Sequence, residues 1–587
     1  MLLGEKGDLD AEIKSLYQRA GIAHVLAISG LHISLLGMGL YRLLRKRLHT
    51  QYVTAALATT VFLISYAVLS GNGVSTQRAV GMCLIYLFAD VTGYAYDMLN
   101  ALGIVVLVLL WENPFLLSYS GFVFSVMAVI AIGVGANVLL EWEHSWKRRQ
   151  QAGEENIKKT FFSRQKEGIL VSFAIQLFTI PLVAYSYYEI PVYAMLINLF
   201  VLAVVNGLLG LTVLGVIVGM VFLPAGSVLF APCGWMLDSY RFLCEVSLKI
   251  PGAQRITGKP AHMRIFWYYL GLGVFLLAIY ACARRNEKHK DGRETADLCV
   301  SRRKKRLQGI VFSCFIAFLL LFLLFPQKKS FEIDFLDVGQ GDGIYLCTGG
   351  GTSMFIDGGS TDVKQVGKYR ILPFLKAKGV SEISYWFVSH TDTDHVSGLK
   401  EVLVSGYRVE YLVFAKAVEK EAKTKELAEL ARSHGTKVLY MQAGDTVRSK
   451  RAAMRCLYPK ASDKAEDVND LCLVLQFEEG DIRALFGGDI STDVEEQLSR
   501  REKWDKVLVF KADHHGSRYA NAEALLKCIR PEITVASAGK DNRYGHPSPD
   551  AVQRIKESGS RFFCTIEGGR IRGRVIENKL VCETYVK

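Results

Sequence analysis

The chain has 587 residues, too many for one hydrophobic core, and typical domain lengths of about 100 to 200 residues predict three or four folded units. Long apolar runs dominate residues 1–325, which excludes a wholly water-soluble protein, whereas residues 326–587 have the charges and turn residues of a water-soluble domain. The net charge of +13 suits a polyanion partner, but topology alone explains many of the basic residues, so charge by itself does not establish DNA binding.

The apolar runs of the first part predict membrane-spanning helices, because about 20 consecutive apolar residues cross the hydrocarbon core of a bilayer. In chain order these runs are residues 22–40, 53–69, 79–91, 101–111, 121–140, 168–188, 192–222, 266–283 and 309–325. The run at 192–222 is long enough for two spans. The stretch at 226–250 holds Asp238, Arg241 and Glu245, so we expect it to lie along the interface or to line a cavity. We expect about nine to eleven crossings in total.

Basic loops predict the orientation of these spans. Residues 44–48, residues 147–166 with seven Lys or Arg, and residues 284–306 with ten Lys or Arg against four acidic residues should remain in the cytoplasm. An even number of spans must then separate neighbouring loops, and one further span follows the last loop. We therefore expect a multi-pass protein of a bacterial cell membrane whose residues 326–587 are extracytoplasmic.

Polar residues interrupt the apolar runs in two places. His24 and His32 lie eight residues apart near one helix face, Ser29 and Gly30 lie between them, and Arg78 begins a later run. Polar groups are costly at membrane depth, so these residues predict the lining of a cavity or channel. The alternative for Ser29 and Gly30 is close packing between helices, which small residues favour.

The second part has short strand-like runs, glycine-rich turns and helical patterns between them. Its predicted strands lie within residues 331–346, 353–359, 385–389, 411–415, 438–441, 473–478, 483–486, 507–511 and 534–538, and its predicted helices include residues 419–434 and 493–501. We expect a sandwich of sheets with helices outside. Its six cysteines include no Cys-x-x-Cys pair, and burial as free thiols is favoured over disulfides.

Residues 389–398 read Ser-His-Thr-Asp-Thr-Asp-His-Val-Ser-Gly and hold a dense group of metal-ligating side chains. A turn after a strand can wrap such a group around one or two cations. Further histidines and an aspartate follow other predicted strands, and loops that leave strands along one edge of a fold converge. The sequence therefore predicts a metal hydrolase site, and its candidate ligands are His390, Asp392, Asp394, His395, Asp489, His514 and His515.

Other polar residues near these loops have ordinary structural explanations. Asp342 and Asp357 stand beside glycines and are more often structural residues of turns. His546 precedes Pro547, so a role in the site and a loop contact are both open. An Asp-Thr-Asp run alone is usually a solvated turn, and only its combination with histidines on other loops favours metal binding.

Two sets of motifs in the chain resemble one known family. The second part contains Phe335-Leu-Asp-Val-Gly-Gln-Gly-Asp342, Ile356-Asp-Gly-Gly359, Ser389-His-Thr-Asp-Thr-Asp-His395, Gly487-Gly-Asp489, His514-His-Gly-Ser517 and Tyr544-Gly-His-Pro547. These segments look like the metallo-β-lactamase fold, in the version found in ComEC-type competence proteins. In the first part, residues 20–34 and Ser75-Thr-Gln-Arg-Ala79 resemble the competence membrane domain, so the resemblance covers nearly the whole chain.

The resemblance implies a polytopic α-helical membrane domain over residues 1–325 and an αββα sandwich of metallo-β-lactamase type over residues 326–587. It also implies two divalent metal ions. By analogy, His390 and Asp392 would hold one ion. Asp394 and His395 would hold the other, and Asp489 would bridge the two ions.

Further roles follow from the same resemblance. His514 is the preferred last ligand and His515 is the alternative. Asp394 and His546 would be catalytic, with His546 acting on the leaving oxygen or binding phosphate. The wider superfamily commonly has His where Asp392 stands, and the additional carboxylate lets Mn compete with Zn.

The family resemblance implies DNA uptake in natural transformation. The first part would be a channel for single-stranded DNA, and the second an extracytoplasmic metal-dependent nuclease that hydrolyses phosphodiesters. A DNA receptor and a cytoplasmic helicase would be partners. Two alternatives stay open: an anchored hydrolase of another phosphodiester such as teichoic acid, and a transporter whose outer domain does not catalyse.

The chain departs from the family pattern in two respects. Family members usually have further spans and a small β-barrel domain before the segment at which this sequence begins, so a truncated start is one explanation. In addition, Cys472 stands where the family often has Ser.

Overall fold

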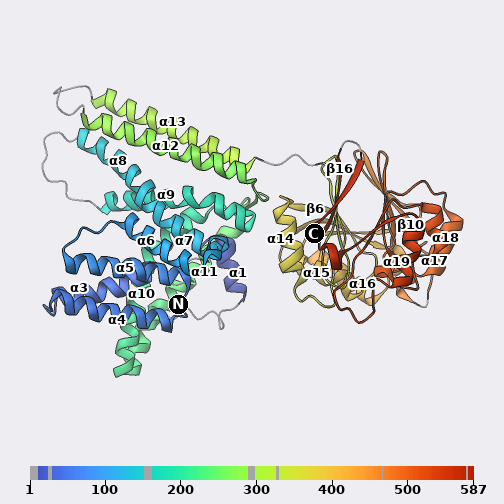
Figure 1. Cartoon of the computed structure of the whole chain (residues 1–587), viewed down its shortest axis with the longest axis horizontal. Coiled ribbons are helices and arrows are strands. Elements are labelled where there is room, and N and C mark those ends of the chain that lie inside the picture. The colour runs from blue at the N-terminus through green and yellow to red at the C-terminus, as the bar shows by residue number, and fades with distance from the viewer. Residues whose placement is uncertain are drawn as a thin grey trace. The chain divides into compact units, whose positions relative to one another are not determined.

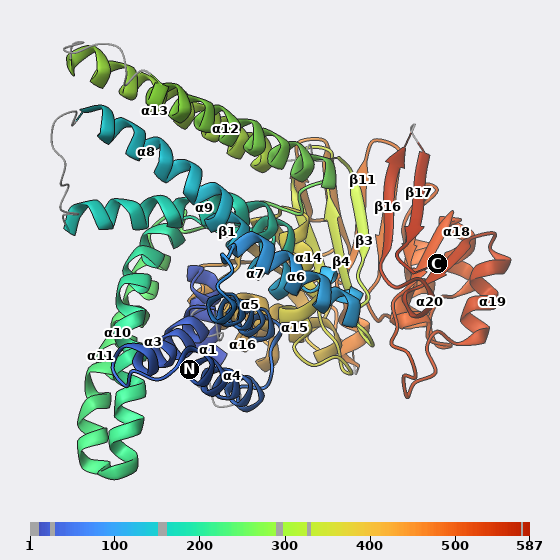
Figure 2. The same cartoon turned by 60° about the vertical axis from the view of Figure 1, so that its left-hand side comes forward.

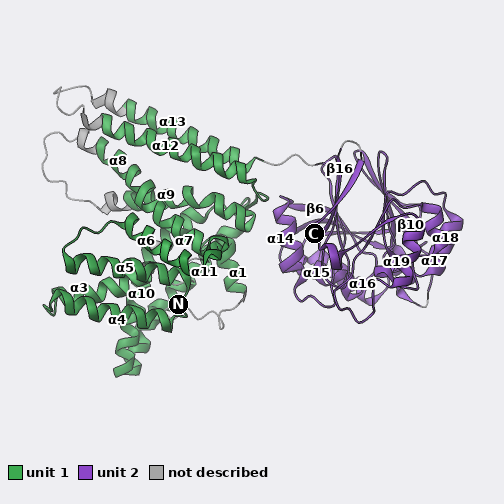
Figure 3. Ribbon diagram, in the orientation of Figure 1, with its two compact units in different colours: residues 1–325 green, residues 326–587 purple. Residues whose placement is uncertain are grey.

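The computed structural model describes residues 11–23, 30–150, 161–288, 298–325, 330–465, 467–576 and 579–586. The chain forms two compact units, Met1–Phe325 and Pro326–Lys587, shown in green and purple in Figure 3. Each unit packs around hydrophobic clusters of its own.

The first unit is helical. Six of its described helices are long and apolar enough to cross a membrane: Tyr52–Leu69, Ser120–Trp146, Lys166–Tyr187, Ala194–Val221, His262–Arg285 and Arg303–Leu324. The chain is therefore a multi-pass membrane protein. A shorter apolar helix, α6 (Met98–Glu112), covers the predicted run at residues 101–111. The expected total of about nine to eleven crossings stays a prediction.

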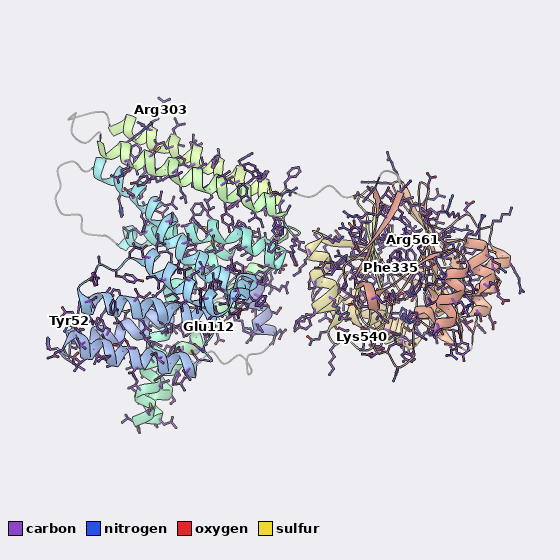
Figure 4. All side chains as sticks on the ribbon, in the orientation of Figure 1. Tyr52, Glu112, Arg303, Phe335, Lys540 and Arg561 are labelled. Atoms are coloured by element: carbon purple, nitrogen blue, oxygen red, sulfur yellow. The ribbon has the colours of Figure 1, made fainter. Side chains whose placement is uncertain are left out.

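Most helices of this unit overlap the predicted runs. Besides α6, its described helices, which include the six candidate spans, are α1 (Ala11–Ala20), α2 (Gly30–Ile33), α3 (Gly39–Lys46), α4 (Tyr52–Leu69), α5 (Val74–Thr92), α7 (Ser120–Ile130), α8 (Asn137–Gln150), α9 (Phe161–Tyr187), α10 (Ala194–Val221), α11 (Leu223–Lys249), α12 (His262–Lys288) and α13 (Leu298–Leu324). A π-helical segment, Ala131–Ala136, joins α7 to α8, so residues 120–146 form one continuous span. Figure 4 labels Tyr52 at the start of α4 and Glu112 at the end of α6.

Helices α10 and α11 form a tightly packed antiparallel hairpin (Figure 2). Gly226 lies so near Gly219 that an added Cβ would come 2.5 Å from the Gly219 Cα. The expectation that residues 192–222 supply two spans is wrong, because α10 runs through them as one helix with no proline or charge to interrupt it. Residues 226–250 instead form most of α11, so four long helices, α9 to α12, still separate the two larger basic loops.

The second unit contains two mixed sheets, of seven strands (β15-β14-β13-β12-β11-β10-β9) and eight strands (β17-β16-β3-β4-β5-β6-β7-β8). The strands of the first sheet are β9 (Thr446–Ser449), β10 (Ala452–Tyr458), β11 (Val474–Glu479), β12 (Ile482–Phe486), β13 (Val509–Lys511), β14 (Ile533–Ala536) and β15 (Arg561–Cys564). Those of the second are β3 (Glu332–Phe335), β4 (Gly343–Cys347), β5 (Ser353–Asp357), β6 (Glu382–Phe387), β7 (Arg408–Ala415), β8 (Lys437–Met441), β16 (Ile571–Ile576) and β17 (Lys579–Thr584).

Helices cover the outer face of each sheet (Figure 1). Helices α14 (Leu372–Ala377), α15 (Thr393–Val404) and α16 (Ala422–Ser433) pack on the eight-stranded sheet, and α17 (Thr492–Arg501), α18 (Glu523–Ile529) and α19 (Pro549–Glu557) on the seven-stranded sheet. Phe335 and Phe477 belong to the core between the sheets. Strand β5 is buried at every position because both of its faces are covered. The predicted αββα sandwich is confirmed.

The six cysteines of the second unit are all free thiols. Four of them, Cys347, Cys456, Cys472 and Cys564, are buried, as the apolar runs predict. Burial raises the pKa of Cys456 to about 12, which keeps that thiol protonated and unreactive.

Candidate metal centre

The candidate ligands lie on loops that leave parallel strands. Strands β12, β13 and β14 run parallel in one sheet, and β5, β6 and β7 run parallel in the other, so within each sheet the carboxyl ends of these strands share one edge. His390 follows β6, Asp489 follows β12 and His515 follows β13. Short distances between these side chains show that the loops converge, as the sequence predicts.

Glycines bring the first turn of α15 close to the neighbouring loops. An added Cβ on Gly341 would lie 2.4 Å from the Asp394 carbonyl oxygen, and one on Gly359 would lie 2.4 Å from the His395 amide nitrogen. No larger residue fits at either position without displacing backbone. The glycine-rich segments around both positions therefore fix where the Asp394–His395 turn sits.

Two histidines are anchored through their Nδ1 atoms. His395 Nδ1 lies 3.0 Å from Asp357 Oδ2, and His515 Nδ1 donates to the Ser537 carbonyl oxygen at 3.0 Å. A hydrogen bond at Nδ1 fixes the orientation of an imidazole and leaves Nε2 free to bind a cation. Asp357 also accepts a hydrogen bond from the Ser389 amide through Oδ1, so this aspartate ties β5 to the loop that carries the ligands.

The third histidine, His390, is held in the same manner. Its Nδ1 lies 3.1 Å from Ser389 Oγ and 3.4 Å from Cys472 Sγ. Cys472 therefore sits behind the ring, on the side away from Nε2. This position gives the cysteine a supporting contact in place of the hydroxyl that the family resemblance implies there.

The two inward Nε2 atoms converge on one carboxylate. His395 Nε2 and His515 Nε2 each lie 3.4 Å from Asp489 Oδ2, and His515 Nε2 lies 3.6 Å from Asp394 Oδ2. Both nitrogens and Asp489 Oδ1 are buried, with no hydrogen-bond partner among the described residues. Buried polar atoms without partners are costly, and a divalent cation at this point would satisfy all three. The donor set therefore fits a metal ion.

The possible ligands fall into two groups that share His395. One group is Asp342, His395, Asp489 and His515, and the other is His390, Asp394 and His395. Within each group, one ligand atom from every residue lies within 4.8 Å of the others. The arrangement supplies imidazole and carboxylate donors together, the types that Zn and Mn both accept.

Asp342 supports the site from behind. Its carboxylate lies 2.5 Å from Lys511 Nζ and 3.5 Å from His515 Nδ1. It therefore contacts the ring nitrogen of His515 that does not face Asp489. Both Asp342 and Lys511 are fully buried. A carboxylate already neutralised by an ammonium group is a weak ligand, so we assign Asp342 to holding His515 in place. Lys511, which the sequence places in a strand, is the partner that sequence reasoning missed.

Charges in the cluster compensate one another. Burial raises the pKa of Asp489, but the neighbouring His515 and His395 outweigh burial and hold that pKa well below its usual value. Asp489 and other carboxylates in turn raise the pKa of both histidines well above 6.5, against the effect of burial. Burial and then the charge of His395 lower the pKa of His390 to about 4. Without a cation, the raised pKa values favour protonation of His395 and His515, and metal binding must displace those protons.

Asp392 occupies the outer side of the cluster. Its Oδ2 lies 4.0 Å from His390 Nε2, and its Oδ1 accepts a hydrogen bond from Lys423 Nζ at 2.8 Å. The Asp392 side chain is 45% exposed, and it belongs to neither buried group. A metal ligand at this position would have to compete with Lys423.

The geometry favours His515 over His514 as a candidate ligand. His515 is buried within the cluster, whereas His514 is 33% exposed and its Nε2 lies 3.8 Å from Asp489 Oδ2. Both residues have left-handed backbone angles, with φ of 51° and 55°, so their side chains cannot be assigned from strand alternation. Sequence alone could not decide which of two adjacent histidines turns inward.

His546 lies beside the histidine pair. Its ring centroid is 5.6 Å from that of His514 and 6.3 Å from that of His515. Burial, and then the charges of His515 and His514, lower the pKa of His546 to about 4. The imidazole is therefore neutral near pH 7. Its position beside His514 and His515 favours a role in the site over a simple loop contact, the two explanations that the sequence allowed.

The predicted polar site of the first unit is only partly described. His24 and Ser29 lie outside the described residues. Gly30 and Arg78 come together, because an added Cβ on Gly30 would lie 3.4 Å from Arg78 Nη2. Arg78 is buried and donates from Nε to Ser125 Oγ at 2.7 Å, and His32 is buried on α2.

Comparison with known proteins identifies the first unit. Residues 1–281 match the model of the family described as "Competence protein". ComE operon protein 3 of Bacillus subtilis is 25% identical over 98% of this chain and 70% of its own length. Recombination protein 2 of Haemophilus influenzae is 24% identical over 99% of this chain and 71% of its own length. The chain is therefore similar to competence proteins over nearly its whole length, and residues 1–281 match the competence family itself.

The matches to these two relatives, unlike the family match, extend through the second unit. Among solved structures, the metallo-β-lactamase fold protein YhfI of Bacillus subtilis is similar over 42% of this chain and 100% of its own, with 11% identity and a TM-score of 0.30. The family match and the two relatives confirm the resemblance drawn from the motifs.

Proposed function

We propose that this protein acts in DNA uptake, with the first unit as a conduit for single-stranded DNA and the second as a metal-dependent phosphodiesterase. Similarity to competence proteins supports the uptake role. The observation that carries the hydrolase assignment is the convergence of His395 Nε2 and His515 Nε2 on Asp489, all buried and without other partners among the described residues.

Two divalent ions would be held by the carboxylates and imidazoles of the cluster. The residues that would hold them are His390, Asp392, Asp394, His395, Asp489 and His515. Three carboxylates beside three imidazoles make the site harder than an all-histidine site, so Mn competes with Zn. When bound, such ions lower the pKa of a water molecule and stabilise charge on a phosphoryl group.

The protein's own residues would orient the reacting groups. Asp394 is 19% exposed and lies beside the buried His515, so its carboxylate is in contact with both the cluster and solvent. His546 is neutral near pH 7 and would donate a hydrogen bond to a phosphate or leaving oxygen rather than carry a charge. His514, on the exposed side, would contact the substrate.

The conduit is assigned to the polar site of the first unit, His24, Ser29, Gly30, His32 and Arg78. Arg78 supports it most directly, because its guanidinium is buried and its hydrogen-bond partners among the described residues, Ser125 and Met82, are neutral, which suits a passing phosphate. The basic loops and the four helices between them support an extracytoplasmic position for the second unit. A DNA receptor and a cytoplasmic helicase are proposed as partners.

The test uses the full chain, purified in detergent, stripped of metal and supplied with Mn, Zn or Mg in turn. Cleavage of single-stranded and double-stranded DNA would be measured beside Asp394→Ala and the control Asp493→Ala, an exposed acid on α17. We expect metal-dependent cleavage that Asp394→Ala removes and Asp493→Ala keeps. Metal binding without cleavage of either DNA would contradict the nuclease and favour a different phosphodiester such as teichoic acid.

A further inference from the structure

A stack of rings leads from the buried cluster to the surface. His515 is buried, and its ring is near-parallel to that of His546, at 27° and 6.3 Å between centroids. His546 in turn stacks with Tyr544, at 26° and 5.7 Å. Tyr544 is 49% exposed, so the series begins at the candidate metal ligands and ends in solvent.

The loop that carries Tyr544 is held in shape by one side chain. Asn542 Nδ2 donates to the carbonyl oxygens of Gly539 at 2.9 Å and His546 at 2.6 Å. Its Oδ1 accepts from the amides of Tyr544 at 3.2 Å and His546 at 3.0 Å. Four hydrogen bonds from one residue fix the loop before any substrate arrives, which lowers the entropy cost of binding.

One cation contacts the exposed end of the stack, and two more are exposed on the loops that carry it. The Arg543 guanidinium lies 4.8 Å from the Tyr544 ring centroid and donates to the Tyr544 hydroxyl at 2.5 Å. Lys540 and Arg518 are exposed on the loops that hold His546 and His515, and Figure 4 labels Lys540. Within the described part of the chain, none of these three cations forms an ion pair. They are therefore available to a phosphate backbone.

Exposed aromatic rings beside unpaired cations are the elements of a single-strand binding surface. A base within a duplex is stacked on both faces and paired at its edge, so it cannot offer a face to a tyrosine. An unpaired base can. The fixed loop would then set the distance between the stacked base and the cluster.

We propose that Tyr544 stacks an unpaired base of single-stranded DNA and so positions a neighbouring phosphate at the metal centre. Tyr544 is a specificity-determining residue, and Asn542 is a positioning residue that acts through it. This inference takes its ligand, single-stranded DNA, from the proposed function. It concerns binding of that DNA, which can be measured whether or not the protein cleaves it.

The test measures binding of a fluorescent single-stranded oligonucleotide by the full chain in detergent with Mn, in an Asp394→Ala background that prevents cleavage. We expect Tyr544→Ala to weaken binding by about 5- to 150-fold, the range for one base on one aromatic ring, and Tyr544→Trp to retain it. Binding of a blunt duplex should change little in either variant. Tyr519→Ala is the matched control, because Tyr519 is 72% exposed on the neighbouring loop.

A second arm uses an oligonucleotide series with one abasic position. The protein with Tyr544 should lose affinity when the abasic nucleotide reaches the stacked position, and Tyr544→Ala should show no such loss. Asn542→Ala should weaken binding of the normal strand and not of the abasic strand. Equal affinity of Tyr544→Ala and its parent, or an equal loss in Tyr519→Ala, would overturn the inference. Failure of cleavage with intact base-dependent binding would instead contradict only the nuclease.

Discussion

The two units bury charge in opposite ways. In the first unit, Arg78 is a buried cation whose described hydrogen bonds go to the neutral Ser125 and Met82. In the second, Asp489 is a buried anion between His395 and His515, whose bound protons compensate it. Because desolvated charge favours a counter-ion, the first site is suited to an anion and the second to a cation. DNA phosphates and divalent metals meet those two requirements.

The largest expected effect comes from removing the central anion. Asp489→Asn keeps the side-chain volume but leaves the two histidines without their shared carboxylate. We expect metal affinity to fall by more than about 100-fold. The metal-free protein should also lose on the order of 3 kcal/mol of stability, because a buried pair is broken. Titration with Mn or Zn and thermal unfolding of the purified chain would check both.

The control for this change is Asp505→Asn, an exposed acid paired with Arg483 at the surface. It should alter neither metal affinity nor unfolding measurably. If Asp489→Asn bound metal as tightly as the unchanged chain, the second unit would not accept its cation at this cluster.

The next effect is the pH dependence of metal binding. His395 and His515 have pKa values raised well above 6.5, so their contribution to the stability of the metal-free protein is complete below pH 6.5 and is lost as pH rises through the raised values. Metal must displace both protons. Affinity should therefore rise by up to about 100-fold per pH unit in that window.

Proton release into a weakly buffered solution, followed with an indicator dye during metal titration, measures this directly. Between pH 6.5 and the raised pKa values, release should approach two protons per cluster. Chelation should destabilise the protein more at pH 8.5 than at pH 6.5. At the higher pH fewer protons bind to the two histidines in place of the removed metal. A pH-independent affinity would show that these histidines do not bind the ion.

The smallest effect is expected at the membrane site. Arg78→Gln removes the charge but keeps hydrogen-bond donors, so the amount of protein in the membrane should be unchanged. Uptake of labelled DNA by cells that carry the variant should fall by roughly tenfold, the loss of about one charge-assisted hydrogen bond to phosphate. Arg78→Lys should restore part of it.

Arg241→Gln, on α11 and paired with Glu245, is the matched control because it is exposed and lies outside this polar site. Normal uptake by Arg78→Gln would contradict the anion-binding role of the first unit and would leave only the metal-binding role of the second unit supported.

Local spacing predicted the parts of the site that one turn builds. His390, Asp394 and His395 lie within six residues, and a strand followed by a tight turn brings such neighbours together whatever the rest of the fold does. The convergence of Asp489 and the His514–His515 pair was predictable for a similar reason, since loops after parallel strands share an edge.

Interactions between distant residues could not be predicted in this way. Asp357 holds His395 from 38 positions away, and Lys511 neutralises Asp342 across the two sheets, while each residue alone reads as part of a turn or a strand. The glycines beside Asp342 and Asp357 were the available signal, because they mark close backbone approach. Helix α11 was also not predicted as one long helix. Its charged residues interrupt the apolar pattern, although its apolar face packs on α10.

The order of strands in the eight-stranded sheet has a consequence for synthesis of the protein. Strand β3, the first of the second unit, pairs with β4 on one side and with β16 on the other, although β16 begins only at Ile571. Until those last residues are made, β3 presents an open edge that can pair with another chain. Pairing of the β16–β17 hairpin with β3 therefore completes the sheet. A protein that lacks these two strands should aggregate before it can assemble a metal centre.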